Sequence, residues 1–416
     1  MHNNGAKSRR RIITGLIAIA VVGVVLLLYH GCRLPAPVGE PVFDGDSREL
    51  KATQVVPTLD TPIQEGMNAI WCASFVSAWK TLETDLAKES LSLQGSPEVA
   101  LGLNKAADPQ PYIPEASLYV AAGWNQKGIT DQIRKDLAQK FPTKAQPTFP
   151  GITPISFVMY AYLEANVKFS LPYFQNRDPL VFIEREGNKT ELSSFGIRPE
   201  DDYAYFTLRQ QPAILFEARD ERHTLAEYVV DLDHTSKHNQ IILFLVKPKP
   251  TLAEILEYVE EKISTAGEYE QQKGLGPNDV LLVPDIVWRI SHRFAELEGK
   301  EFTNTNLKGQ TIDVAQQDIH FRLDRSGAEL KSEAKSYMLP APTYYIFDRP
   351  FLLYMKKRGS EMPYFVMWIE NAELLNRWQP NEKPQQNASG ALCPAHLGRS
   401  ERPGRRPAGQ VSGGPC

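Results

Sequence analysis

The order of helix-like and strand-like segments restricts this chain to few architectures. Apolar residues recur at helical spacing over residues 69–88, at the end of residues 117–141 and over residues 251–263. The remaining periodic segments are short, apolar and strand-like, and they dominate the later part of the chain. A βαβ array would instead alternate strands and helices throughout. The sequence therefore predicts an α+β fold in which helices pack with large mixed or antiparallel β-sheets.

Local signals refine two of these segments. Thr251 precedes the helix over residues 251–263, and Glu254 follows three residues later, which is the pattern of an N-terminal cap. Pro284 lies inside the segment 280–290, so that strand is expected at a sheet edge or a bulge. The predicted strands cover residues 155–167, 180–183, 203–208, 227–231, 241–246, 280–290, 319–323, 351–355 and 364–369.

The N-terminus carries a basic stub followed by an uncharged apolar run over residues 12–29. As a helix, such a run nearly crosses a hydrocarbon core of about 30 Å, and the basic flank favours a cytoplasmic N-terminus. Three fates remain open: a retained transmembrane anchor, a cleaved signal peptide, or a lipoprotein signal ending at Cys32. Each of them places the rest of the chain outside the cytoplasm, in an extracellular or periplasmic space.

The organisation that follows has four parts. Residues 1–31 form the stub and the membrane or signal segment, and residues 32–64 are rich in Pro, Gly and Asp and are interpreted as a linker. Residues 65–376 form the globular domain. Residues 377–416 are dense in Pro, Gly, Gln and Arg, and they are expected to be disordered because they contain too little apolar surface to bury.

Several function classes are disfavoured by charge and motif content. The net charge is −4, so no global basic field draws the chain to nucleic acid. The four cysteines lie far apart and lack zinc-like spacing, and Cys72 is expected to be a buried thiol. His234 and His238 would lie on one face of a helix, but the turn residues around them favour a solvated turn. We therefore predict a monomer that is not an enzyme and needs no cofactor or metal.

The most informative segment lies in the last third of the chain. Residues 319–329 read IHFRLDRSGAE, and residues 347–354, after a variable stretch, read FDRPFLLY. This pattern resembles the C-terminal region of the serpin family of protease inhibitors: a strand and a hinge, an exposed bait loop, and re-entry through a Pro-Phe strand. Weaker similarity extends over residues 65–376 in the family's order. The residues that match the family pattern are Gly327, Glu329, Pro350 and Phe351.

The resemblance implies that a protease cleaves the loop and that the freed hinge then inserts into a sheet as a new strand. Side chains alternate across a strand, so one set must suit a core and the other water. The set that would face inward is Ala328, Leu330, Ser332 and Ala334, and the other is Glu329, Lys331, Glu333 and Lys335. The pattern permits insertion, but alternating charge is also typical of an exposed loop or edge strand.

The same resemblance locates the bait. Counting from Gly327 places the cleaved bond at Ala341–Pro342, and counting back from Pro350 places it at Leu339–Pro340. Proline after the bond slows most serine proteases, because its φ is fixed and its amide hydrogen is missing. Two functions therefore stay open: an inhibitor of an extracellular or periplasmic protease, and a non-inhibitory binding or structural module of the same fold.

Overall fold

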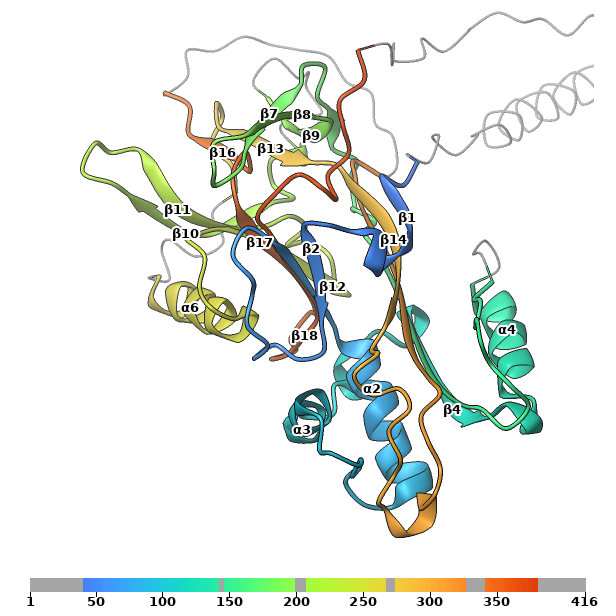
Figure 1. The fold of residues 1–416 in the computed structure, drawn as a ribbon. Helices are drawn as coiled ribbons and strands as arrows, with labels where there is room; N and C mark the ends of the chain where they lie inside the picture. The colour runs from blue at the N-terminus through green and yellow to red at the C-terminus, as the bar shows by residue number, and fades with distance from the viewer. Residues whose placement is uncertain (1–39, 142–145, 199–206, 267–273, 327–340, 381–416) are drawn as a thin grey trace, which may run out of the picture. The chain divides into compact units, whose positions relative to one another are not determined.

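The computed structural model describes residues 40–141, 146–198, 207–266, 274–326 and 341–380. Within these residues the chain forms two large sheets, two small ones and a few helices (Figure 1). The predicted α+β class is thereby confirmed. The longer helices are α2 (Ala73–Leu82), α3 (Glu98–Lys105), α4 (Ile129–Lys140) and α6 (Leu252–Thr265), and a π-helical turn, η2 (Glu83–Ala87), continues α2.

The five-stranded sheet contains the strand that leads into the predicted hinge. Its order is β1 (Phe43–Asp46), β14 (Ile286–Arg293), β15 (Val314–Leu323), β5 (Phe157–Asn166) and β4 (Leu118–Trp124). β15 is antiparallel to β14 but parallel to β5, and the parallel register runs from Val314 opposite Val158 to Arg322 opposite Asn166. We call the contact between β5 and β15 the seam.

The other sheets complete the fold. The seven-stranded sheet has the order β10 (Ala213–Arg219), β11 (Leu225–Asp231), β12 (Asn239–Leu245), β17 (Phe351–Lys357), β18 (Pro363–Ile369), β3 (Asn68–Cys72) and β2 (Thr53–Val56). The four-stranded sheet has the order β16 (Tyr344–Ile346), β13 (Val280–Pro284), β9 (Ser194–Ile197) and β6 (Phe174–Gln175). A separate hairpin pairs β7 (Leu180–Ile183) with β8 (Lys189–Leu192).

The main core lies between the two large sheets. Phe321 of β15 stacks on Phe365 of β18 with ring centroids 4.7 Å apart, and Trp288 of β14 packs against both rings. Helix α2 is almost wholly buried beside this core, which explains its apolar sequence. Burying these large rings removes much apolar surface from water, and this supplies the main driving force for joining the sheets.

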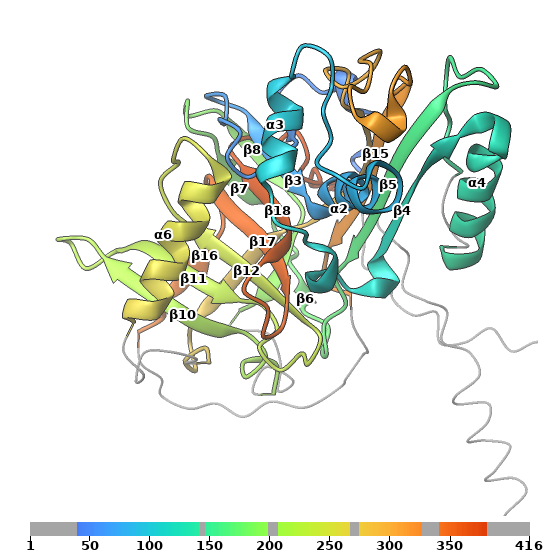
Figure 2. The ribbon, with the colours of Figure 1, turned by 90° about the horizontal axis from the view of Figure 1, so that it is seen from below.

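Helix α4 covers the other face of the five-stranded sheet, over β4 and β5 (Figure 2). Its apolar side chains Ile129, Ile133 and Leu137 belong to a separate cluster with Tyr160 and Tyr162 of β5. The sheet is therefore buried on both faces in this region, so any rearrangement of the seam must disturb packing on both sides.

Three sequence predictions about elements were wrong. Residues 69–72 belong to β3, which pairs with β18 on one side and β2 on the other. Every residue of β3 is buried, so the strand shows no alternation, and the helix begins only at Ala73. Residues 43–56 of the predicted linker contain β1 and β2, whose sequences FDGD and TQVV form neither a continuous apolar run nor a clear alternation of apolar and polar residues. The segment 280–290 is two strands in different sheets, because the chain changes sheet at Asp285.

Other predictions are confirmed. β5, β7, β11, β12, β17 and β18 lie where strands were expected, and Thr251 caps α6 by accepting a hydrogen bond from the backbone N–H of Glu254. Most of the predicted strand 203–208, the apolar run 12–29 and nearly all of the tail lie outside the described residues. Within the described part of the chain, no helix has both the length and the apolar character that crossing a bilayer requires.

Candidate functional site

The chain leaves the five-stranded sheet next to the end of β5. Past Leu323, the backbone carbonyl of Arg325 accepts a hydrogen bond from Tyr173 at 3.2 Å, and that of Ser326 accepts one from Phe169 at 3.2 Å. These contacts hold residues 324–326 against the segment that follows β5. Ser326, the residue before the predicted hinge, therefore lies beside the end of the seam.

The predicted loop re-enters the fold at the four-stranded sheet. Ala341 and Pro342 are exposed, and Thr343 is anchored because its N–H donates to the Asp279 carboxylate at 2.9 Å. β16 then pairs in parallel with β13. The remaining predicted site residues lie outside the described residues: Gly327, Ala328, Glu329, Leu330, Ser332, Ala334, Leu339 and Pro340.

The direction of the strands makes the seam suitable for accepting a strand. A chain that turns back after β15 runs antiparallel to β15, and because β15 and β5 are parallel it runs antiparallel to β5 as well. Parallel pairing is slightly less stable per residue than antiparallel pairing. A strand placed in the seam would thus replace one parallel ladder with two antiparallel ladders.

The inner face of the seam is tied to the start of α2. The side-chain amide of Gln317 donates to the Ser74 hydroxyl at 2.9 Å and to the backbone carbonyl of Cys72 at 3.1 Å. The Cys72 sulfur lies 3.1 Å from the Ser74 hydroxyl, and burial raises the pKa of this thiol to about 12. Cys72 is therefore a protonated, buried thiol at neutral pH, which agrees with the sequence prediction.

The outer face of the seam carries a polar network beneath α4. The Tyr160 hydroxyl donates to the Asp318 carboxylate at 2.7 Å, and the Tyr162 hydroxyl lies 3.1 Å from Nδ1 of His320. Burial raises the pKa of Asp318, although its hydrogen bonds to Tyr160 and Gln316 act in the opposite direction. Sequence reasoning missed this network, since the four residues are spread over two strands far apart in the chain.

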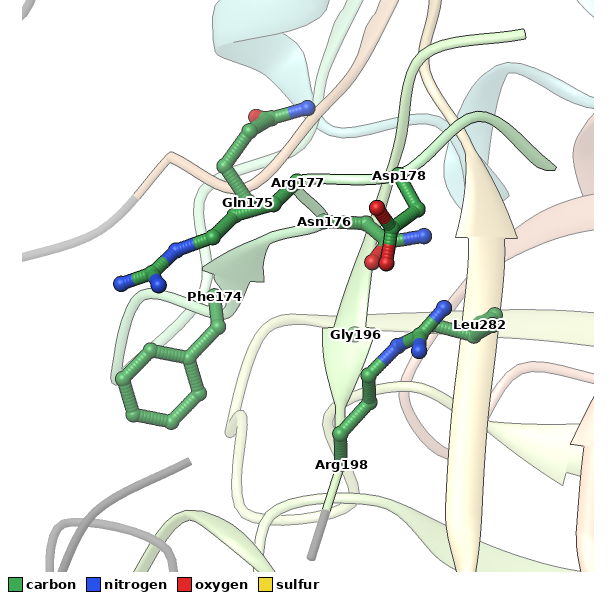
Figure 3. A pocket seen from close by; sticks show the side chains of 8 residues that line it. All are labelled: Phe174, Gln175, Asn176, Arg177, Asp178, Gly196, Arg198 and Leu282. Carbon is green, nitrogen blue, oxygen red and sulfur yellow. The ribbon is translucent and has the colours of Figure 1, made fainter. Parts of the chain in front are cut away.

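Two further features are less informative. A cavity of about 320 Å³ lies beside β6 and β9, and in Figure 3 the side chain of Arg198 extends toward Asp178. Arg198, one of its lining residues, is the last described residue before Thr207, so residues 199–206 lie outside the described residues. His234 and His238 lie in the turn region between β11 and β12, and no group of His, Cys, Asp and Glu suited to a metal occurs among the residues that the structure describes.

Comparisons with known proteins return structural neighbours alone. No family model matches the chain, and no curated protein matches it by sequence. One similar solved structure is native protease nexin-1 with heparin, with 9% identity, a TM-score of 0.47, and coverage of 73% of this chain and 92% of that one. A second is the mouse protein-Z dependent protease inhibitor, with 12% identity, a TM-score of 0.48, and coverage of 73% and 91%. A third is Serpin48 of the insect Tenebrio molitor, with 11% identity, a TM-score of 0.43, and coverage of 73% and 92%.

Proposed function

We propose that this chain is a divergent serpin-like protease inhibitor that acts outside the cytoplasm through cleavage of a bait loop and insertion of a strand. The observation that carries the proposal is the parallel pairing of β5 and β15, together with the position of the predicted hinge directly after β15. The sequence did not predict that β15 pairs with β5. This pairing is therefore a line of support separate from the sequence resemblance.

The proposed reaction begins with the target protease. Its nucleophile attacks the carbonyl of the bait residue, the peptide bond breaks, the new amino terminus leaves with a proton, and the protease stays attached as an acyl-enzyme. The freed hinge then enters the seam with Ala328, Leu330, Ser332 and Ala334 facing the core. Insertion carries the attached protease along the sheet and distorts it before water can release it.

The bait residue is proposed to be Leu339, which Pro340 follows, or Ala341, which Pro342 follows. Proline at this place disfavours cleavage by most serine proteases. The target is accordingly a protease that tolerates proline after the cleaved bond, or one that cuts elsewhere in the loop.

The apolar run over residues 12–29 is proposed to tether the domain to a membrane or to direct its export. Its connection to the domain is short. Val42 donates its N–H to the backbone carbonyl of Val287 near the start of β14. The start of β14 pairs with the last residues of β15. A retained anchor would thus hold the loop end of the five-stranded sheet near the membrane surface.

A non-inhibitory binding or structural module is the second candidate. Leu330 favours it, because a side chain larger than Ala at an inward position of the inserted strand overpacks the core, at a cost of about 1–3 kcal/mol. The two prolines favour it as well. In this alternative the loop is exposed for another reason and does not enter the seam.

One experiment separates the two candidates. The purified protein is nicked in residues 336–342 by limited proteolysis, and its melting temperature is measured before and after. A large rise supports insertion, whereas an unchanged melting temperature supports the non-inhibitory module. Incubation with a panel of serine and cysteine proteases tests inhibition itself: if no SDS-stable complex forms with any of them, the inhibitor proposal is wrong.

A further inference from the structure

Two side-chain links cross the seam on the face covered by α4. The register places Tyr160 opposite Gln316 and Tyr162 opposite Asp318. Tyr160 nevertheless bonds to Asp318, and Tyr162 contacts His320. Each tyrosine therefore reaches the residue two positions beyond its partner, so the same diagonal contact is made twice in succession.

Each link is held at one end by further hydrogen bonds. The amide of Gln316 donates to the other carboxylate oxygen of Asp318 at 3.0 Å and lies 3.2 Å from the Ser291 hydroxyl of β14. On the opposite side, the Tyr162 hydroxyl donates to Glu164 at 3.2 Å. Because that hydroxyl has a single proton, Nδ1 of His320 is the donor in the second link.

Packing keeps the two phenol rings in place. Tyr160 is 0% and Tyr162 2% exposed. Phe149 meets the Tyr160 ring edge-on with centroids 5.6 Å apart, and Phe141 lies 4.6 Å from the Tyr162 ring. The hydroxyls are consequently shielded from water. In such a buried environment, hydrogen bonds to charged groups are stronger than they are in water. Phenylalanine at either position would keep the ring packing and remove the link.

The links are incompatible with an open seam. Adjacent strands lie about 4.8 Å apart, so a strand placed between β5 and β15 would move them to about twice that separation. A hydrogen bond of 2.7 Å does not survive such a displacement.

We infer that Tyr160, Asp318, Tyr162 and His320 form a clasp that holds the seam closed and limits how fast it opens. Its role in insertion rests on the proposed function, whereas its role in holding the two strands together does not. The clasp residues are positioning residues: they contact no target, and they act through the separation of β5 and β15.

Hydrogen–deuterium exchange of the β5 and β15 amides tests the clasp directly. In Tyr160→Phe these amides should exchange about tenfold faster than in the wild type, as expected for the loss of one hydrogen bond to a charged group. The matched control is Tyr119→Phe, because Tyr119 lies on the same face of the sheet but bonds to Asp136 of α4, at 3.0 Å, rather than across the seam. Equal exchange in the wild type and Tyr160→Phe would overturn the inference, as would equal acceleration in both variants.

Uptake of a synthetic peptide with the sequence of residues 327–338 gives a second readout. The clasp predicts faster uptake by Tyr160→Phe and Tyr162→Phe than by Tyr119→Phe. Uptake at one rate by all variants would show that the clasp does not limit opening, and would overturn it. Faster exchange without uptake by any variant would support the clasp and contradict the proposed insertion, so the two failures are distinguishable.

Discussion

The side-chain amide of Gln317 joins the strand that precedes the hinge to the hydroxyl of Ser74, 2.9 Å away at the start of α2. Asp318, the next residue, bonds across the opposite face of the sheet to Tyr160. Successive side chains of a strand point to opposite faces of the sheet. Gln317 therefore holds β15 on the face toward α2, and Asp318 holds it on the face covered by α4. Side-chain hydrogen bonds thus hold the middle of β15 on both faces of the sheet.

Replacing Gln317 should destabilise the fold. Gln317→Ala leaves the buried carbonyl of Cys72 and the hydroxyl of Ser74 without this donor, and we expect a loss of about 1–3 kcal/mol in the free energy of unfolding. Urea denaturation measures the change. The control is Gln132→Ala on the exposed side of α4, which should change stability by less than about 0.5 kcal/mol. A loss no larger than that of the control would contradict the role given to Gln317.

Acid should destabilise the fold through His292 of β14, whose ring contacts Ser47, the residue that follows β1. Burial lowers the pKa of His292 from 6.5 to about 4, and its Nδ1 lies 2.7 Å from the Ser47 hydroxyl. Below pH 6.5 the unfolded chain binds a proton that the folded chain does not bind, so this residue's contribution to stability falls by about 1.4 kcal/mol per pH unit down to about pH 4. His292→Gln should remove that slope.

The measurement is the free energy of unfolding at pH 7 and pH 5 for wild type and variant. Carboxyl groups with raised pKa values, such as Asp318, act in the opposite direction, and the difference between the two proteins isolates the histidine. His223→Gln is the control, because His223 is exposed between β10 and β11. Parallel pH profiles for the wild type and His292→Gln would refute the prediction.

Gly196 should not tolerate a side chain. A Cβ atom at this position would lie 1.8 Å from the backbone carbonyl oxygen of Leu281, so β9 and β13 could not keep their present separation. We expect Gly196→Ala to cost about 3 kcal/mol or more, at the upper end of overpacking penalties. The control is Gly187→Ala in the tip of the β7–β8 hairpin, where an added Cβ atom would meet no other atom within 4 Å. Its φ of +88° leaves only backbone strain, of about 1 kcal/mol. Thermal denaturation compares the two, and equal losses would count against the argument.

A charge on the inward side of the proposed inserting strand should block inhibition without blocking cleavage. Ala334→Arg would bury an unpaired charge, whereas Glu333→Arg would place one on the water-facing side. The first variant should be cleaved as a substrate with at least a tenfold loss of covalent complex, and the second should behave as the wild type. Gel analysis of complex and cleaved product gives the ratio. Similar behaviour of both variants would exclude the predicted alternation.

Local patterns were sufficient for many elements. The spacing of Leu252, Ile255 and Val259, together with the cap at Thr251, predicted α6, and apolar runs predicted β5, β17 and β18. β3 was mistaken for helix because Trp71 happens to fall in register with the apolar positions of α2. β1 and β2 were missed because FDGD and TQVV are not apolar runs, whereas β7, which is equally short, reads LVFI.

The sequence by itself determined the fold class, the periodic elements and the resemblance around Gly327 and Pro350, because each depends on neighbouring residues in the chain. Only the tertiary structure decided that β15 lies parallel to β5, that Tyr160 reaches Asp318, and that Gln317 reaches Ser74. These contacts join residues more than 150 positions apart. Strand pairing is set by how two apolar faces pack, and no local period in the sequence records which distant strand becomes the neighbour.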